Sequence, residues 1–300
     1  MRVVFLGTSS GTPTLARYLS SVAVVREGEI FLFDCGEGTQ IRFRRARLRF
    51  SRLERIFISH LHGDHVTGLM GLLMSLQMAE RVQPLYLHGP PGLQEYVLTC
   101  KRLLHTQFAY QLIVEEAGKA GVLCDTPEYY VECAPLEHRL FTLGFALQEK
   151  PRPGVFNVAV AQALGIPEGP LYGRLQRGET IVLEDGRTVR PEQVLGPPRP
   201  GKRIAYCPDT RPCENALALA RNADLLIHEG TFGAELHAEA VRKTHATVVE
   251  AAEIAKTAGA KRLVLTHFSP RYRDLEPLRQ QAAAIFPHVT VAEDLMEIEV

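Results

Sequence analysis

The segment HLHGDH, which begins at His60, holds the densest group of chemically active side chains in the sequence. His60 and His62 are two residues apart, so in an extended loop both can face the same ion. Gly63 then permits a sharp turn that directs Asp64 and His65 toward a second ion. Zn²⁺ prefers such imidazole and carboxylate ligands in near-tetrahedral geometry. The segment therefore predicts a zinc site. The alternatives are a cluster of surface histidines or a closed structural site, and structural sites usually use cysteine.

Five predicted strands end just before residues that can bind a metal or transfer a proton. They are Ile30–Phe33 before Asp34, Arg55–Ile58 before His60, Ile204–Cys207 before Asp209, Leu225–Ile227 before His228 and Glu229, and Leu263–Leu265 before His267. In mixed sheet proteins, ligands gather at one edge, beyond the strand ends, where loops converge. One such placement arises easily by chance, but five predict a common site.

The remaining pattern of short β-rich segments and amphipathic helices predicts an α/β chain (α+β mixed). Further strands are expected at Val3–Leu6, Ser21–Val25, Leu85–Leu87, Tyr129–Ala134, Ala146–Glu149 and Val289–Val291. Helices are expected at Val66–Gln77, Leu93–Leu104, Glu214–Ala220, Thr247–Ala258 and Leu275–Ala284. The fourth helix has well-marked ends, because Thr247 and Glu250 form a capping box and Gly259 suits a C-terminal cap.

The stretch from about residue 148 to residue 203 differs in composition from the rest of the chain. It is rich in proline and glycine, as in GIPEGP and GPPRPG. Nine basic and six acidic residues give it a net charge of +3. This composition predicts an inserted arm or subdomain rather than more of the core.

Bulk composition limits the function classes. Hydrophobic residues make up 46% and charged residues 23%, as in ordinary globular proteins. The net charge is zero, so nucleic-acid binding would need local patches. One candidate is the run from Arg42 to Arg55, where seven arginines face a single acid. This run is either a phosphate-binding surface or a solvated helix face without a partner, and the sequence leaves both open.

The cysteine pattern and the apolar segments bear on localisation. Six cysteines are scattered without a CxxC pair, the N-terminal apolar run is too short for a signal peptide, and no run of 18 apolar residues occurs. We expect a cytoplasmic protein without a membrane span, whose cysteines are reduced.

HxHxDH is the metal motif of the metallo-β-lactamase superfamily, and nearly the whole chain resembles one of its families, ribonuclease Z, the tRNA 3′-processing endonuclease. The matching segments are LGTSSGTPTLAR, DCGEGTQ, SHLHGDHVTGL, PLEH, GIPEGPLYGRLQRGE, PDTRP, HEGTF, KTHAT and LTHFSPRY. The arm with KTHAT and LTHFSPRY is specific to the family. The resemblance implies a four-layer αββα sandwich, formed by a single domain over residues 1–300, with a flexible tRNA-binding arm inserted at about 148–203.

The resemblance also implies two zinc ions per subunit. The first ion would bind His60, His62 and His138, the second would bind Asp64, His65 and His267, and Asp209 would bridge both. Two ions about 3.5–4 Å apart can clamp both reacting oxygens of a phosphodiester. The implied reaction removes the 3′ trailer from precursor tRNA and leaves a 3′-hydroxyl on the tRNA.

Three residues are candidates for proton transfer. In this hypothesis Asp64 accepts the proton of the attacking water. His245, just ahead of the capped helix and paired with Glu229, donates a proton to the leaving 3′-oxygen. The alternative for His245 is a structural loop histidine.

Substrate binding is expected at two places. Arg271, four residues after His267, would contact a phosphate near the cut. Gly169 and Pro170, at the centre of the arm, would hold the body of the tRNA. In the family the arm of one subunit serves the active site of the other, which implies a homodimer. The alternative is an insertion that only packs.

Other polar residues have weaker assignments. Asp34 resembles a family residue that supports the metal ligands through hydrogen bonds, and a strand-end turn aspartate is an equally good hypothesis. His228 is expected to be structural. No role is assigned to His88, His105, His237 and His288.

Two other function classes share part of this pattern. A small-molecule phosphodiesterase or thioester hydrolase of the same superfamily has the motif but no need of a basic arm. A metal-free RNA-binding or scaffolding member would lack some ligands, whereas here all seven are present. A β-lactamase is disfavoured by the missing secretion signal.

Overall fold

The computed structural model describes residues 1–300. The chain forms two compact units. The first contains residues 1–125, 131–147 and 203–300, and the second contains residues 126–130 and 148–202. No helix in the molecule combines the length and the apolar character needed to cross a bilayer.

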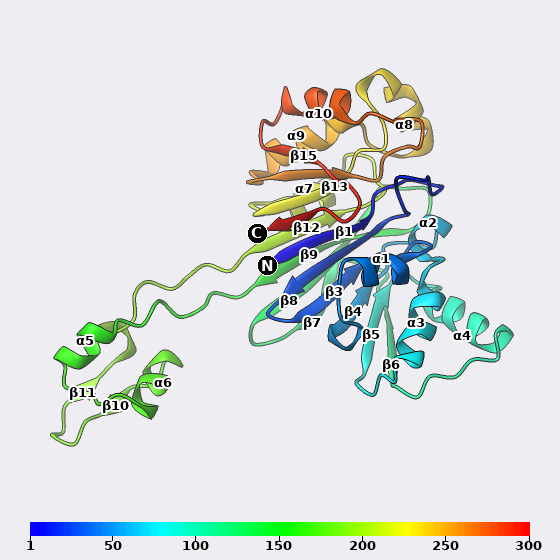
Figure 1. The fold of residues 1–300 in the computed structure, drawn as a ribbon. Helices are drawn as coiled ribbons and strands as arrows, with labels where there is room; N and C mark the ends of the chain where they lie inside the picture. The colour runs from blue at the N-terminus through cyan, green and yellow to red at the C-terminus, as the bar shows by residue number, and fades with distance from the viewer. The chain divides into compact units, whose positions relative to one another are not determined.

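Two seven-stranded sheets lie at the centre of the first unit (Figure 1). In spatial order, the first contains β16 (Glu297–Glu299), β1 (Arg2–Gly7), β2 (Ser21–Arg26), β3 (Glu29–Phe33), β4 (Leu53–Phe57), β5 (Leu85–Gly89) and β6 (Leu112–Glu116). The second contains β15 (Val289–Val291), β14 (Leu263–Thr266), β13 (Leu225–Glu229), β12 (Arg203–Cys207), β9 (Thr142–Glu149), β8 (Tyr129–Leu136) and β7 (Gly121–Asp125). Strands β3 to β6 are parallel, as are β12 to β15, so in each set the carboxyl ends share one edge.

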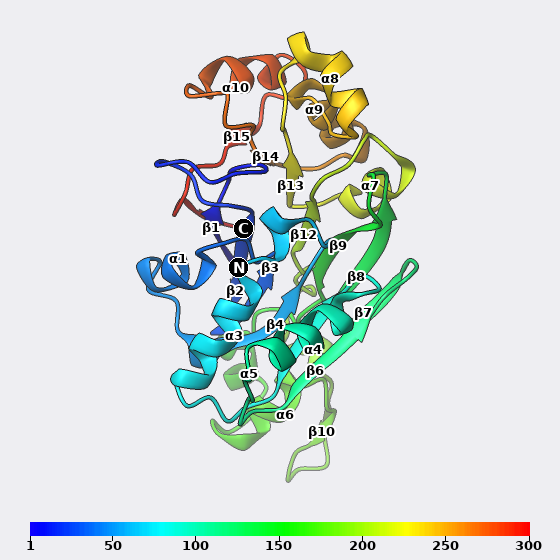
Figure 2. The same ribbon diagram turned by 90° about the vertical axis from the view of Figure 1, so that its right-hand side faces the viewer.

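Helices cover the outer faces of both sheets (Figure 2). Beside the first sheet lie α1 (Thr39–Arg45), α2 (Gly63–Val66), α3 (Leu69–Met78) and α4 (Leu93–Leu103). Beside the second lie α7 (Glu214–Ala220), α9 (Val248–Ala258) and α10 (Glu276–Ala283). Each helical layer shares an apolar cluster with its sheet, as α3 does through Leu72 and Leu76, and α9 through Ala251 and Ala255. Helix α8 (His237–Lys243) and the short 3-10 helices Phe50–Arg52 and Ala234–Leu236 complete this unit.

Aromatic side chains join the two sheets. The ring centroid of Phe145 in β9 lies 5.9 Å from that of Phe33 in β3 and 5.6 Å from that of Phe57 in β4. Tyr206 in β12 approaches Phe33 to 5.8 Å. All four rings are buried. This packing holds the two sheets face to face and confirms the four-layer arrangement.

Every predicted strand is present, with its ends shifted by at most a few residues. Strands β6 and β7 were not predicted, because they are edge strands whose side chains are mostly exposed or half-buried, so their hydrophobic alternation is weak. Strand β16 and the helices α1 and α8 were not predicted either.

The predicted helix Val66–Gln77 was wrong at its start, because the helical backbone is interrupted at Gly68, between α2 and α3. The Gly68 N–H donates to the carbonyl of Cys35 at 2.9 Å, outside the helix. A Cβ on Gly68 would lie 1.9 Å from the carbonyl oxygen of Gly36. The glycine therefore allows the loop after β3 to pack directly against the HLHGDH segment.

The capping prediction for α9 is confirmed. Thr247 Oγ1 accepts from the Glu250 N–H at 3.2 Å, and the Glu250 carboxylate accepts from the Thr247 N–H at 2.8 Å. Gly259 ends the helix with φ at 67°. The start of α9 is thus rigidly defined just after His245.

The arginine run is not one solvated helix face. Arg42 is buried and pairs with Asp294 at 3.2 Å. Arg55 lies in β4, with its guanidinium 4.3 Å from the ring centroid of Tyr86. The exposed members are Arg44, Arg45, Arg47, Arg49 and Arg52. Arg44, although exposed, has its guanidinium 5.3 Å from the ring centroid of Phe50, so three of the seven arginines have structural contacts.

The second unit has a small apolar core of its own. It contains α5 (Val158–Ala163), α6 (Pro170–Gln176), the hairpin β10 (Ile181–Val182) and β11 (Thr188–Val189), and the 3-10 helix Pro191–Gln193. Its core includes Ala161, Ile166, Leu175, Ile181, Val189 and Val194. Its two connecting segments pair antiparallel, with Arg152 and Arg199 exchanging N–H···O bonds of 2.9 Å. A Cβ on Gly154 would lie 1.9 Å from the Gly196 carbonyl oxygen, so this pairing requires the glycine.

Candidate metal centre

The loops after β4, β8, β12 and β14 bring seven histidine and aspartate side chains together. One group contains His60, His62, His138 and Asp209, and another contains Asp64, His65 and His267. In each group the ligand atoms lie within 4.8 Å of one another. All seven residues selected from the sequence as ligands are therefore found in one place, although they span more than 200 positions of the chain.

In the first group, three imidazoles lie near one carboxylate oxygen. Asp209 Oδ2 lies 3.6 Å from His60 Nε2 and 3.7 Å from His138 Nε2. His62 Nδ1 lies 2.9 Å from His60 Nε2 and 3.3 Å from His138 Nε2. Burial lowers the pKa of all three histidines. Their neutral form, which offers a lone pair to a metal, is thus favoured.

The second group uses the other oxygen of the same aspartate. Asp209 Oδ1 lies 3.2 Å from His65 Nε2 and 3.1 Å from His267 Nε2. Asp64 Oδ2 lies 3.3 Å from His267 Nε2 and 3.6 Å from His65 Nε2. Burial opposes ionisation of Asp64, but the neighbouring His65 and His267 rings, in their charged form, outweigh burial and lower the pKa of this carboxyl. Asp64 is therefore a carboxylate at neutral pH.

Buried Asp34 orients the histidines that follow β4. His65 Nδ1 lies 2.8 Å from Asp34 Oδ2, which also accepts from Ser59 Oγ at 2.9 Å and Tyr206 Oη at 2.7 Å. Because the Ser59 hydroxyl donates to Asp34, it accepts from His60 Nδ1, 2.9 Å away. In the neutral form of each ring, Nε2 is then the nitrogen without a proton, and it faces the centre. These contacts favour the supporting role for Asp34 over a simple turn residue.

The other two oriented histidines are fixed by residues near α8 and α9. His138 Nδ1 donates to the Thr244 carbonyl at 2.8 Å. His267 Nδ1 lies 2.9 Å from Thr231 Oγ1, whose hydroxyl donates to Glu229. The Thr231 oxygen therefore accepts from His267 Nδ1. In the neutral form of these two rings as well, Nε2 carries the free lone pair.

This donor set fits a metal ion. Asp209 Oδ1 is buried without a hydrogen-bond partner. In the neutral tautomers that these contacts set, the lone pairs of His65 Nε2 and His267 Nε2 face each other across only 3.2 Å. Facing lone pairs repel each other, and a cation between them turns that repulsion into ligation. The arrangement is that of a metal-binding site.

Strained backbone accompanies the ligands. Asp34, Thr244 and His267 have φ values of 58°, 57° and 62°, the left-handed region that non-glycine residues rarely occupy. Each such conformation costs on the order of 1–3 kcal/mol. Asp34 and His267 both directly follow a strand, so the unusual φ turns the side chain back toward the site.

His245 lies beside the ligands and against Glu229. Its Nδ1 is 2.9 Å from Glu229 Oε1 and 3.9 Å from Asp209 Oδ2. Burial disfavours the charged ring, but Glu229 and then Asp209 outweigh burial and raise the pKa of His245 to about 9. Glu229 is fully buried and also accepts from the Thr210 N–H at 2.7 Å. A protonated, oriented imidazole therefore lies next to the metal ligands.

Two further contacts fix the backbone of His245. Its N–H donates to the Ala240 carbonyl at 2.9 Å, at the end of α8. Its own carbonyl accepts from Arg211 Nη1 at 2.5 Å, and Arg211 also pairs with Glu250 of the capping box. The ring is thus held by α8, α9 and the loop after β12 together.

A cavity of about 370 Å³ opens over this centre, and His62, Asp64, Asp209 and His245 line it. Its wall also carries two cations that were not among the predicted site residues, Arg139 and Lys243. Their sequence positions carried a signal, because Arg139 directly follows His138 and Lys243 comes two residues before His245.

The predicted phosphate contact Arg271 lies at the edge of the same region. Its guanidinium lies 5.2 Å from the ring centroid of Phe232, and the Lys243 ammonium lies 5.8 Å from the same ring. Phe232 lines the cavity. Arg271 is exposed and therefore open to a substrate.

The remaining sequence candidates lie elsewhere. Gly169 and Pro170 belong to the second unit, where both are exposed at the start of α6 and Gly169 has φ at 135°. His228 is fully buried, with its Nδ1 2.7 Å from the Glu229 carbonyl, as a structural histidine would be. His88 is also buried and stacks on Phe57 at 5.0 Å.

Two family models match parts of the chain. One, described as anti-Pycsar protein Apyc1, matches residues 1–100, and the other, a beta-lactamase superfamily domain, matches residues 190–268. The structure of the metallo-β-lactamase fold protein YhfI from Bacillus subtilis shares the fold, with a TM-score of 0.70, 18% identity, and coverage of 99% of this chain and 98% of that one. With the two sheets and their shared site, these matches define the fold of the chain as the metallo-β-lactamase fold.

Full-length relatives give the family. A ribonuclease Z from Acaryochloris marina is 48% identical over 307 residues, which cover 100% of this chain and 98% of the relative. A ribonuclease Z from Synechocystis is 46% identical, with 100% and 94% covered. The structure of human tRNase Z, short form, matches with a TM-score of 0.75 at 30% identity, covering 100% of this chain and 99% of that one. The chain belongs to the ribonuclease Z family.

Proposed function

We propose that this chain is a metal-dependent endoribonuclease that hydrolyses one phosphodiester bond of precursor tRNA. The cut removes the 3′ trailer, leaving a 3′-hydroxyl on the tRNA and a 5′-phosphate on the trailer. One observation carries the proposal: a chain that matches ribonuclease Z over its full length brings seven ligands and the His245–Glu229 pair to one cavity.

The metal in this proposal is zinc, with two ions per subunit. His60, His62 and His138 would hold one ion, Asp64, His65 and His267 the other, and Asp209 would bind both. The donor set supports zinc, because neutral imidazoles and carboxylates are ligands that it prefers. When bound, such ions polarise a phosphodiester and stabilise the negative charge that develops during its hydrolysis.

The chain's own residues would move the protons. Asp64 accepts the proton of the attacking water, and its Oδ2 is held by the Gly11 N–H at 2.6 Å. His245 donates a proton to the leaving 3′-oxygen, which is a poor leaving group without one. Glu229 keeps the imidazole oriented through the 2.9 Å contact at Nδ1.

Substrate and subunit partners complete the proposal. Arg271 binds a phosphate near the cut, and the second unit, with Gly169 and Pro170, binds the body of the tRNA. The protein would act as a cytoplasmic homodimer.

The direct test uses labelled precursor tRNA that carries a 3′ trailer, with Zn²⁺ and the full-length protein. We expect a single endonucleolytic cut near the discriminator base and a 5′-phosphate on the released trailer. Asp64→Ala, assayed in parallel, should give no cut. If the wild type left the precursor intact but readily hydrolysed a small phosphodiester, the small-molecule phosphodiesterase would become the better assignment.

Removing the second unit should separate its binding role from the chemistry. Residues 153–196 can be replaced by a short glycine link, because Arg152 and Arg199 are already hydrogen-bonded neighbours. We expect kcat/KM for precursor tRNA to fall about 100-fold, which corresponds to roughly 3 kcal/mol of lost binding. Hydrolysis of bis(p-nitrophenyl) phosphate should stay within about twofold, because the ligands all lie in the first unit. Equal loss of both activities would argue against a binding role.

A further inference from the structure

The loop from Thr8 to Tyr18, here called the supporting loop, contacts a ligand of the second group. The Gly11 N–H donates to Asp64 Oδ2 at 2.6 Å. Gly11 has φ at 71°, a conformation natural to glycine, so its N–H can be aimed at the carboxylate without strain. The position of Asp64 therefore depends on where this loop lies.

The same loop also holds the turn that carries His267. The Ser10 N–H donates to the carbonyl of Phe268 at 3.0 Å, and the Phe268 N–H donates to the carbonyl of Thr8 at 2.9 Å. Phe268 directly follows His267, which has the left-handed backbone noted above. Two hydrogen bonds thus fasten this strained turn to the supporting loop.

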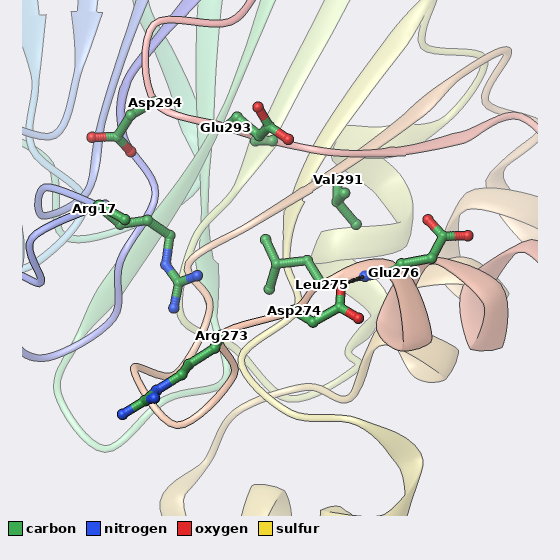
Figure 3. A pocket seen from close by; sticks show the side chains of 10 residues that line it. Arg17, Arg273, Asp274, Leu275, Glu276, Val291, Glu293 and Asp294 are labelled. Carbon is green, nitrogen blue, oxygen red and sulfur yellow. Dashed lines mark hydrogen bonds between the residues drawn. The ribbon is translucent and has the colours of Figure 1, made fainter.

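Arg17, near the end of the loop, adds a second clamp. Its Nη2 donates to the carbonyl of Tyr272 at 2.8 Å and to that of Ser269 at 3.4 Å. The side chain is 9% exposed. Figure 3 shows Arg17 and Asp294 among the side chains that line one cavity, which has a volume of about 430 Å³.

Asp294 fixes both ends of the supporting loop. Its Oδ1 accepts from Thr8 Oγ1 at 2.9 Å, and its Oδ2 accepts from the Tyr18 N–H at 2.9 Å. The carboxylate also pairs with Arg42 at 3.2 Å, and both side chains are at most 7% exposed. A buried charge is retained only where it is paired and hydrogen-bonded, so the carboxylate is tightly constrained.

Arg42 is in turn constrained by the first sheet. Its Nε donates to the carbonyl of Leu6 in β1 at 3.2 Å. Its guanidinium lies 4.8 Å from the ring centroid of Tyr18. The ion pair therefore links α1, the first sheet and the residues after β15 to one short loop.

We propose that Asp294 and Arg42 are positioning residues for the metal centre. Through Thr8 and Tyr18 they fix the supporting loop, which in turn places Asp64 and the turn of His267. Their contribution is to the metal affinity of the second ligand group. The inference rests on the metal site of the proposed function and is independent of the RNA substrate.

The test measures Zn²⁺ affinity of the full-length protein by competition with a chromophoric chelator. Asp294→Ala should weaken one of the two Zn²⁺ affinities by about tenfold, as replacement of groups that support metal ligands commonly does, and leave the other within twofold. Arg42→Met should do the same, and Arg42→Lys, which keeps the charge opposite Asp294, should restore most of the loss. On a phosphodiester substrate, kcat should fall with little change in KM.

A matched control distinguishes positioning from general stability. Glu132 pairs with Arg203 at 2.6 Å in the second sheet, away from the supporting loop. Glu132→Gln should lower the melting temperature without changing either Zn²⁺ affinity. The proposal is overturned if the Asp294 and Arg42 variants, like Glu132→Gln, have a lower melting temperature but unchanged Zn²⁺ affinities. If Asp294→Ala does not fold, the comparison of Arg42→Met with Arg42→Lys decides. Equal Zn²⁺ affinities in those two variants would also overturn the proposal.

Discussion

Replacing Asp209 with alanine is expected to remove metal from both ligand groups and to lower kcat/KM for precursor tRNA by at least about 10⁴-fold. The reason is geometric. Oδ2 of this carboxylate lies 3.6 and 3.7 Å from nitrogens of His60 and His138. Oδ1 lies 3.2 and 3.1 Å from those of His65 and His267. No other side chain approaches both groups with separate oxygens, so its loss leaves two incomplete sets of neutral imidazoles.

Metal content after gel filtration measures this directly. His138→Ala is the matched control, because His138 belongs to the first group alone, and this variant should keep about one ion per chain. Asp209→Asn keeps the shape of the side chain and removes its charge, so it isolates the electrostatic contribution. Retention of two ions by Asp209→Ala would refute the shared role of this residue.

Replacing His245 with alanine should lower kcat on precursor tRNA by about 10²–10⁴-fold, the usual contribution of a general acid. An aryl phosphodiester with a nitrophenol leaving group needs no proton, so its hydrolysis should stay within about threefold. Glu229→Gln should lower kcat by a smaller factor, because His245 would keep its position but lose the carboxylate that lies 2.9 Å from its Nδ1.

Metal content again supplies the control for His245. Its ring also lies within reach of Asp209 and His267, so a role as a metal ligand has to be separated from a role as an acid. As an acid, His245 can be removed while both ions stay bound. A loss of metal, or an equal loss of activity on both substrates, would show that the residue acts by holding the centre together.

The positions of several site residues were predictable, because these residues follow the ends of strands. Asp34, His60, Asp209 and His267 each follow a predicted strand that is present in the structure. The parallel strands of each sheet end at a common edge, so residues after those ends converge. His138 had no comparable signal. It follows β8 in an isolated PLEH segment, and only the resemblance to a family selected it.

The hydrogen bonds that orient the metal ligands could not be predicted from the sequence. Tyr206 and Asp34 are hydrogen-bonded across 172 positions, and Thr231 holds His267 across 36. Serine, threonine and tyrosine are common residues, and nothing in their local pattern marks a buried hydrogen bond. The pairing of Arg42 with Asp294 was hidden in the same way, because the dense arginine run indicated a surface instead.

The origin of the ligands has a consequence for unfolding. His60, His62, Asp64 and His65 follow a strand of the first sheet, whereas His138, Asp209 and His267 follow strands of the second. Ions held by both groups would therefore cross-link the two sheets, which otherwise meet through apolar packing and hydrogen bonds such as that from Tyr206 to Asp34. The two sheets could not separate without releasing the ions, so the metal-loaded protein should unfold in one cooperative step. Its melting temperature should rise with the free metal concentration. The bound metal ions would then stabilise the fold in addition to their role in the reaction.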